Sequence, residues 1–169
     1  MINSEQIGRV ITSRGKKVVQ ASDQQLALFL NVLNNPDIGE YLQGCTPNEL
    51  VELGELSLHP IDRIEGEIAE GARPGPTIFR LGHLPIASTI GGQLLCVSKE
   101  DGKVRWADGS YICDQYICYF DGTRLQELAV TEENLVRRML VVAEDLLELF
   151  ELVESGEINQ IVIDLDLAD

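Results

Sequence analysis

The stretch from Gly82 to Asp108, GHLPIASTIGGQLLCVSKEDGKVRWAD, decides the fold class. It contains three short runs rich in isoleucine, valine and leucine, which are Pro85–Thr89, Gln93–Ser98 and Lys103–Ala107. A Gly-Gly pair separates the first two runs and an Asp-Gly step separates the last two. Asp-Gly supplies the positive φ that tight hairpin turns require. Because strands joined by such short turns pair with their sequence neighbours, the stretch predicts an antiparallel meander.

Strand-like runs continue on both sides of this stretch, over Thr77–Leu81 and Tyr111–Phe120. The segment Glu70–Pro76 is rich in glycine and proline and predicts a loop before them. Helical patterns lie on either side of this strand-rich region. The combination predicts an α+β fold, with a mostly antiparallel sheet and helices packed on one side, in a single domain over residues 1–169.

Two helices are expected before the meander. The first covers residues 22–34, which begin with serine, a common N-cap residue, and place apolar side chains at helical spacing. The second begins at Thr46, because Thr46-Pro47-Asn48-Glu49 has the form of a capping box with proline at the first helical position, and Leu50, Leu53 and Leu58 would form its buried stripe. Residues 1–21 are expected to form either a small hairpin or a loose basic arm.

The longest helical pattern covers residues 131–155. Thr131 is a typical N-cap residue, two glutamates occupy the first turn, and Gly156 is a typical C-terminal stop. The apolar residues at helical spacing are Leu135, Met139, Val142, Leu146, Leu149, Phe150 and Val153. The segment 158–167 then alternates apolar and polar residues, which predicts an additional edge strand after a long amphipathic helix.

The composition restricts the class of partner. The chain has 28 acidic and 13 basic residues and a formal net charge of −15. This charge argues against nucleic acids and anionic membranes as partners, and it permits a basic protein, although solubility alone would also explain it. The N-terminus lacks a secretory-signal pattern, and four scattered cysteines (45, 96, 113 and 118) are typical of reduced thiols. The predicted location is therefore the cytoplasm.

No residue pattern indicates catalysis, a metal or a cofactor. Cys113 and Cys118 are the closest pair of cysteines, and on one strand they would point to opposite faces. His59 and His83 lie on different predicted elements, and the phosphate-binding and nucleophile-elbow motifs do not occur. The chain is therefore predicted to be no enzyme and to bind no cofactor or metal. A hydrolase with an undetected site at one histidine is the least favoured alternative.

One acidic pattern is a candidate binding site. Glu144, Glu148 and Glu151 follow i, i+4, i+7 spacing in the predicted long helix, with Asp145 beside them. Like charges at this spacing cost about 0.2–0.5 kcal/mol per pair in an isolated helix, and no lysine or arginine follows Arg138 in the chain. The stripe is either a docking face for a basic protein or a solvated face. The acidic residues of the Gly82–Asp108 stretch, Asp101 and Asp108, are the second choice for a docking site.

The Gly82–Asp108 stretch also resembles the central motif of the SMI1/KNR4 (SUKH) superfamily. In that motif an apolar strand leads to a glycine-rich turn, a second apolar strand, an Asp/Gly hairpin, and a strand opening with valine and an aromatic residue. The residues that match are Gly91, Gly92, Leu95, Val97, Gly102, Val104 and Trp106. The order of the predicted elements also matches. The family's N-terminal motif ending in Leu-Pro is not clear here, and the strand over 158–167 is extra.

The resemblance implies a protein-binding domain without a catalytic centre. Gly91, Gly92, Gly102 and Trp106 would then have structural roles. Many bacterial members resemble immunity proteins that neutralise a cognate toxin, often a nuclease or a deaminase, and fungal members are regulatory scaffolds. The expected function is therefore an immunity protein that covers the active site of a basic toxin. A regulatory or adaptor domain without a toxin partner is the alternative.

Overall fold

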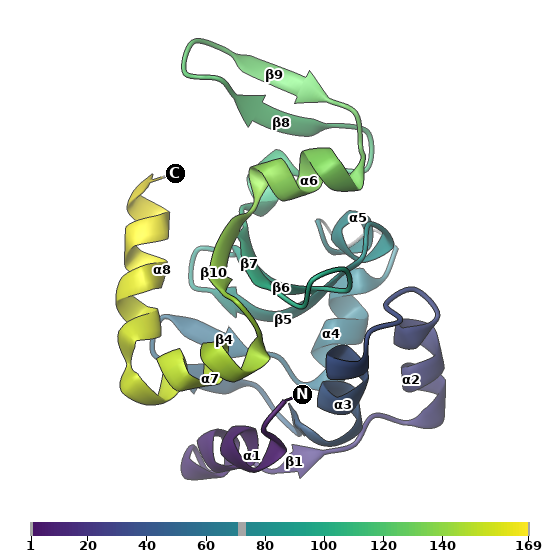
Figure 1. Ribbon diagram of the computed structural model, residues 1–169, viewed down its shortest axis with the longest axis vertical. Coiled ribbons are helices and arrows are strands. Elements are labelled where there is room, and N and C mark those ends of the chain that lie inside the picture. Colours follow the sequence, from purple (N-terminus) through teal and green to yellow (C-terminus); the bar gives the residue numbers. More distant parts are fainter. Residues whose placement is uncertain (1, 71–73, 169) are drawn as a thin grey trace.

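A six-stranded antiparallel sheet lies at the centre of the computed structural model, which describes residues 2–70 and 74–168 (Figure 1). Its strands, in spatial order, are β10 (Leu140–Ala143), β7 (Val104–Ala107), β6 (Leu94–Ser98), β5 (His83–Thr89), β4 (Leu56–Leu58) and β3 (Val51–Leu53). From β3 to β7 each strand pairs with the next one in the sequence, which confirms the predicted meander and the α+β fold. β10 returns from a later part of the chain and pairs with β7.

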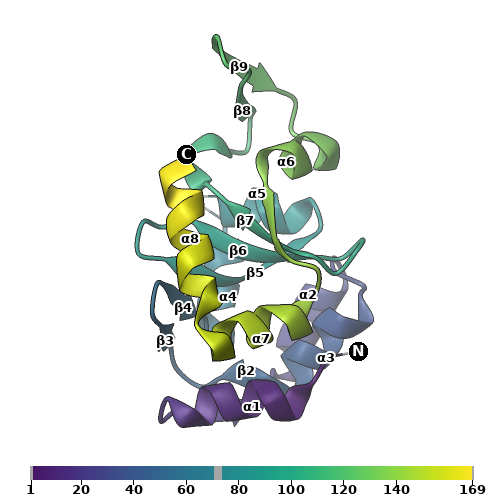
Figure 2. The same ribbon diagram turned by 60° about the vertical axis from the view of Figure 1, so that its left-hand side comes forward.

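Two small strand pairs and the helices complete the described part of the chain. The pairs join β1 (Val18–Val19) to β2 (Thr46–Pro47) and β8 (Ile117–Phe120) to β9 (Leu125–Leu128). The helices are α1 (Ser4–Ser13), α2 (Asp23–Leu30), α3 (Pro36–Gly44), α4 (Ile61–Ile68), α5 (Gly75–Arg80), the 3-10 turn η1 (Gly109–Tyr111), α6 (Glu132–Arg138), α7 (Leu146–Ser155) and α8 (Glu157–Ala168). The β8–β9 hairpin projects beyond α6, away from the central sheet (Figure 2). No described helix is both long and apolar enough to span a membrane.

Apolar side chains cover both faces of the sheet. In β6, Leu95 and Val97 belong to the larger core cluster, whereas Leu94 and Cys96 belong to the smaller one. Alternate residues of a strand point to opposite faces, so the two clusters lie on opposite sides of the sheet. Most helices contribute to the larger cluster, whereas α6 and part of α5 contribute to the smaller one. Helices therefore cover a second face in addition to the one that was expected.

The turns of the meander follow from its glycines. Gly92 and Gly102 have φ angles of +85° and +71°, a region that side-chain-bearing residues rarely adopt. The Gly102 turn joins β6 to β7 and places Leu95 opposite Trp106. The turn residues therefore set the register that puts Trp106 in the larger core cluster.

The N-terminal segment forms neither a hairpin nor a loose arm. Residues 4–13 form helix α1, and the side chain of Asn3 caps it by accepting a 3.1 Å hydrogen bond from the backbone N–H of Gln6. Ile7, Val10 and Ile11 are buried at i, i+3, i+4. This helical spacing was present in the sequence, where the β-branched residues suggested strands instead.

The helix expected from Thr46 is wrong, because this segment contains β2, β3 and β4. Val51 and Leu53 are buried with Glu52 exposed between them, so the pattern has the period of a strand. The turn between β3 and β4 contains Gly54 at φ +75°. The Thr46 hydroxyl donates to the carbonyl of Val19 instead of capping a helix. Leu50, expected in the buried stripe, is 41% exposed.

Two predicted strands beside the meander also need correction. Residues 75–80 form helix α5, with proline in its first turn, although Thr77–Leu81 is rich in strand-favouring residues. Within Tyr111–Phe120 only β8 is a strand, and it pairs with β9 in a separate sheet. Local strand preference could not reveal these tertiary arrangements.

The helix predicted over residues 131–155 is interrupted by a strand. Helix α6 ends at Arg138, β10 follows over residues 140–143, and α7 begins at Leu146. Leu140, Val141 and Val142 favour an extended chain, and β10 pairs with β7. A long-range pairing therefore overrides a continuous helical spacing of apolar residues.

The edge strand predicted over residues 158–167 is helix α8. Ile158 and Val162 are buried one helical turn apart. Asn159 of α8 accepts a 2.9 Å hydrogen bond from the backbone N–H of Glu55 through its side-chain oxygen. The helix therefore packs against the larger core and is fastened to the β3–β4 turn.

Candidate protein-binding surface

The four acidic residues predicted as a stripe lie on two elements. Glu144 follows β10 directly, and Asp145 is the N-cap of α7. Glu148 and Glu151 lie on α7 and alone keep a helical spacing. The i, i+4, i+7 stripe therefore does not exist as one helix face. The four residues nevertheless stay close in space, because they surround the first two turns of α7.

Helix capping explains two of these carboxylates, those of Asp145 and Glu148. A side-chain oxygen of Asp145 accepts a 2.8 Å hydrogen bond from the backbone N–H of Glu148. The Glu148 carboxylate in turn accepts a 2.5 Å hydrogen bond from the backbone N–H of Glu144. Negative charge at a helix N-terminus is favourable, because the helix dipole is positive there. Asp145 and Glu148 therefore start α7, whether or not they also bind a partner.

The surrounding segment has few neutralising cations. We define the acidic C-terminal segment as residues 144–168, which contain eight acidic residues and no lysine or arginine. Its described ion pairs come from other elements: Lys103 Nζ lies 2.7 Å from Glu144, and an Arg9 nitrogen lies 3.9 Å from Glu154. Exposed pairs of this kind contribute little stability. Net negative charge therefore remains on this part of the surface.

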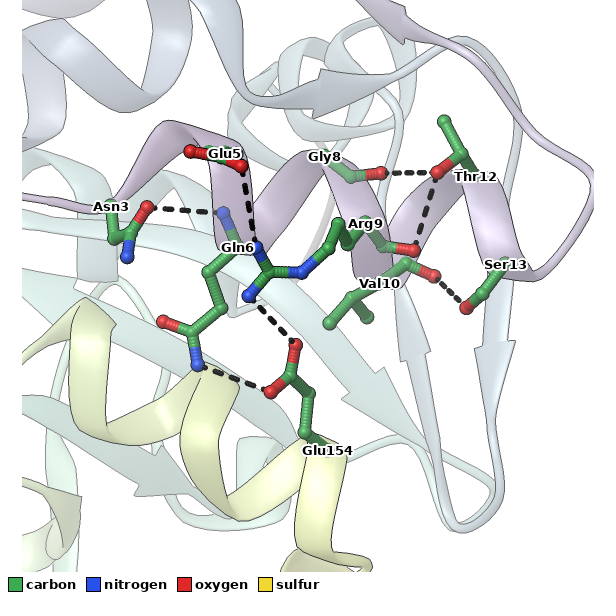
Figure 3. Close-up of polar contacts among 9 residues, drawn as sticks. All are labelled: Asn3, Glu5, Gln6, Gly8, Arg9, Val10, Thr12, Ser13 and Glu154. Atoms are coloured by element: carbon green, nitrogen blue, oxygen red, sulfur yellow. Dashed lines mark hydrogen bonds and ion pairs between the residues drawn. The ribbon is translucent and has the colours of Figure 1, made fainter.

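The N-terminal helix lies against the acidic segment (Figure 3). The Gln6 amide donates a 3.5 Å hydrogen bond to Glu154, and Arg9 points between Glu5 and Glu154. A cavity of about 250 Å³ lies between α1 and α7 and is lined by Arg9, Val10, Ser13, Arg14, Val153 and Glu154. Part of the basic charge of residues 1–21 is thus paired with carboxylates of the same chain.

Asp101 is engaged with an arginine of its own hairpin. Its two carboxylate oxygens accept hydrogen bonds of 2.9 Å and 2.7 Å from the guanidinium of Arg105, whose side chain is only 9% exposed. These hydrogen bonds, together with one from the backbone N–H of Lys103, hold the pKa of Asp101 at about 2. The geometry indicates a structural role, because Asp101 neutralises a buried cation.

Replacing Asp101 with asparagine should therefore destabilise the fold. We expect a loss of about 1–2 kcal/mol at neutral pH, because Arg105 would keep its charge without its bidentate partner, while partial exposure of the site limits the loss. Urea denaturation measures this. Glu100→Gln is the matched control, since Glu100 is exposed in the same turn. Equal stability of the two variants would contradict the structural role.

Asp108 is also directed into the protein. The residue is 8% exposed. As the N-cap of η1, its side chain accepts a 2.9 Å hydrogen bond from the backbone N–H of Ser110. Asp101 and Asp108 therefore differ from the acidic C-terminal segment, because both of their carboxylates accept hydrogen bonds that stabilise the fold.

The residues singled out by the family motif occupy turns and the core. Gly91 and Gly92 are exposed in the β5–β6 turn, and Gly102 lies in the β6–β7 turn. Trp106 is 1% exposed and belongs to the larger core cluster. Comparison of the chain with protein-family models, curated proteins and solved structures finds no match. The resemblance thus rests on the motif itself.

Both histidines are buried, and sequence reasoning did not predict their surroundings. His59 Nε2 lies 2.8 Å from the hydroxyl of Ser88 on the neighbouring strand. Burial is the main cause that lowers the pKa of His59 and of His83 to about 4. Within the described residues, His59 Nδ1 and both ring nitrogens of His83 have no hydrogen-bond partner. A serine–histidine contact is present, but no carboxylate orients its ring in the described structure.

The cysteine pair is arranged differently from the prediction. Ile112 pairs with Ile117, and the backbone N–H of Cys113 donates to the carbonyl of Tyr116 at 3.2 Å, so the chain turns back between the cysteines. Residues on opposite arms of such a turn can share a face. Cys113 and Cys118 both line a cavity of about 240 Å³. Over residues 2–70 and 74–168, no three potential ligands among histidine, cysteine, aspartate and glutamate gather as a metal site.

Proposed function

We propose that this chain is a non-catalytic protein-binding domain of the SMI1/KNR4 type, an immunity protein that neutralises a basic toxin by covering its active site or substrate groove. The observation that carries the proposal is the acidic C-terminal segment, whose eight carboxylates have no cation within the segment. Glu151, Glu157, Asp164 and Asp166 are exposed there. The resemblance over Gly82–Asp108 supports the family assignment, and that assignment suggests the class of partner.

The electrostatics favour a cationic partner. Carboxylates grouped on one surface create a negative potential that attracts a positively charged protein and raises its association rate by 10–1000-fold in strongly steered cases. Enzymes that act on nucleic acids carry positive grooves that bind phosphates. An acidic surface can occupy such a groove in place of the substrate. A nuclease or a nucleic-acid deaminase fits this requirement.

The proposal predicts a partner with two properties. Affinity capture from the source organism at low salt should recover a basic protein that arrests growth when it is expressed alone. Co-expression of this chain should restore growth. Capture of a non-toxic host protein instead would favour the adaptor function, and a toxic partner that stays active in the complex would contradict neutralisation.

The binding surface can be tested by charge reversal at Glu151 and Glu157. Both are exposed, and no side-chain hydrogen bond or ion pair is described for either, whereas Glu148 caps α7 and its replacement would disturb the helix. We expect the Glu151→Lys/Glu157→Lys variant to associate with the captured partner at least about ten times more slowly at low salt.

The matched control is Glu132→Lys/Glu133→Lys. These residues lie in the first turn of α6, and their reversal changes the net charge by the same amount. Stopped-flow association of each variant with the partner separates a local effect from that of net charge. Equal slowing by both variants would remove the assignment of the site to the acidic C-terminal segment and leave a general charge effect.

A further inference from the structure

The central sheet has an uncovered edge at β10. This strand is last in the sheet order, and its outer side pairs with no strand in the described part of the chain. Leu140 and Val141 are 43% and 48% exposed there, although both are large and apolar. β10 runs in front of the other strands, between α6 at one end and α7 at the other (Figure 1). An open strand edge presents unpaired backbone N–H and C=O groups that can pair with another chain.

The two ends of β10 carry opposite charges, so the strand is complementary to an antiparallel copy of itself. Arg137 and Arg138 precede the strand, and Glu144 and Asp145 follow it. Arg137 is exposed and stacks over the ring of Tyr119 at 5.0 Å, and Arg138 lies over Tyr111. If two such strands run antiparallel, the basic end of each meets the acidic end of the other.

We propose that β10 pairs with β10 of a second copy of this chain across a two-fold axis. Pairing would join two six-stranded sheets into one continuous sheet and would cover Leu140 and Val141 of both copies. Arg137 of each copy would lie near Glu144 and Asp145 of the other, so that each charge contact occurs twice. Interfaces of this isologous type are the commonest in homodimers.

Two features of the chain indicate that this dimer is weak. β10 has only four residues, and its register with β7 shifts between Val141 and Ala143, so the paired length is short. A net charge of −15 on each copy repels the other copy at long range. We therefore expect a weak, concentration-dependent dimer at physiological ionic strength, where screening reduces the long-range repulsion more than the contact pairs.

Sedimentation velocity of the purified chain tests the dimer, with no other protein present. The mass should rise from 18.7 kDa toward twice that value as the concentration increases from low micromolar to millimolar. Leu140→Lys should remove this rise, because it places two like charges in the centre of the interface. A wild-type chain that stays monomeric over the whole range would overturn the proposal.

Two further variants test the orientation. Arg137→Glu and Glu144→Arg each place like charges at both ends of the interface, so each alone should be monomeric. An equimolar mixture should form dimers again, because every contact in the mixed dimer joins opposite charges. Circular dichroism checks that each variant is folded. Dimers of either variant alone as stable as those of the wild type, or a mixture that stays monomeric, would show that β10 is not the interface.

Discussion

Replacing Trp106 with alanine should lower the free energy of unfolding by about 3–5 kcal/mol. The side chain is 1% exposed and lies on β7, opposite Leu95 of β6 and Leu140 of β10. The substitution leaves a cavity in the larger core cluster between two strands that cannot move together without breaking their ladders. The loss is a large part of the total stability typical of a domain, about 5–15 kcal/mol. Urea denaturation followed by far-UV circular dichroism measures it.

The controls relate the loss to the amount of buried ring that is removed. The indole N–H of Trp106 has no partner in the described structure, so Trp106→Phe gives up ring area without breaking a hydrogen bond, and its loss should be smaller. Leu125→Ala, at a side chain 56% exposed on β9, should stay within about 0.5 kcal/mol of the wild type. Tryptophan fluorescence cannot follow the alanine variant, because Trp106 is the one tryptophan of the chain. A loss at Trp106 no greater than that at Leu125 would contradict its place in the core.

The central meander could be predicted because its information is local. Each strand from Pro85 to Ala107 is bounded by glycine turns, and Gly92 and Gly102 adopt the positive φ that such turns need. Strand pairing then follows from sequence order.

The C-terminal third could not be predicted in this way. Apolar residues continue at helical spacing through the break between α6 and α7, so periodicity alone gives one long helix. The strand β10 exists because β7 offers an open edge, which is a contact between residues about 35 positions apart in the chain. The alternating residues of 158–167 fit either period, and burial of Ile158 and Val162 against the core selected the helix.

In the candidate site, too, some features could be predicted from the sequence and others depend on tertiary contacts. Acidic composition placed Glu144, Asp145, Glu148 and Glu151 together, and the structure keeps them near one another around the start of α7. The inward roles of the hairpin aspartates depend on hydrogen bonds that only the folded hairpin forms. The spacing of Asp101 and Arg105 around an Asp-Gly turn is the signal that could have indicated an ion pair across the hairpin.

Acidification from pH 7 to pH 5 should destabilise the fold by about 4 kcal/mol. Burial, assisted by Arg63 for His59 and chiefly by Arg105 for His83, lowers the pKa of each from 6.5 to about 4. In the unfolded chain the two histidines therefore take up protons as the pH falls below 6.5. In the folded chain both rings stay neutral until about pH 4. The unfolded state thus gains about 2 kcal/mol per histidine by pH 5. Urea denaturation at several pH values measures this loss.

One substitution tests how much of this loss of stability between pH 7 and pH 5 comes from His83. His83→Leu removes one titrating ring without breaking a hydrogen bond, since neither His83 nitrogen has a partner in the described structure. The variant should therefore lose only about 2 kcal/mol over the same pH range. Asp101 does not interfere, because its pKa of about 2 confines its own contribution to more acidic solutions. NMR titration of the imidazole protons checks the cause directly: two midpoints near pH 4 are expected, and midpoints above pH 6 would contradict the burial of neutral rings.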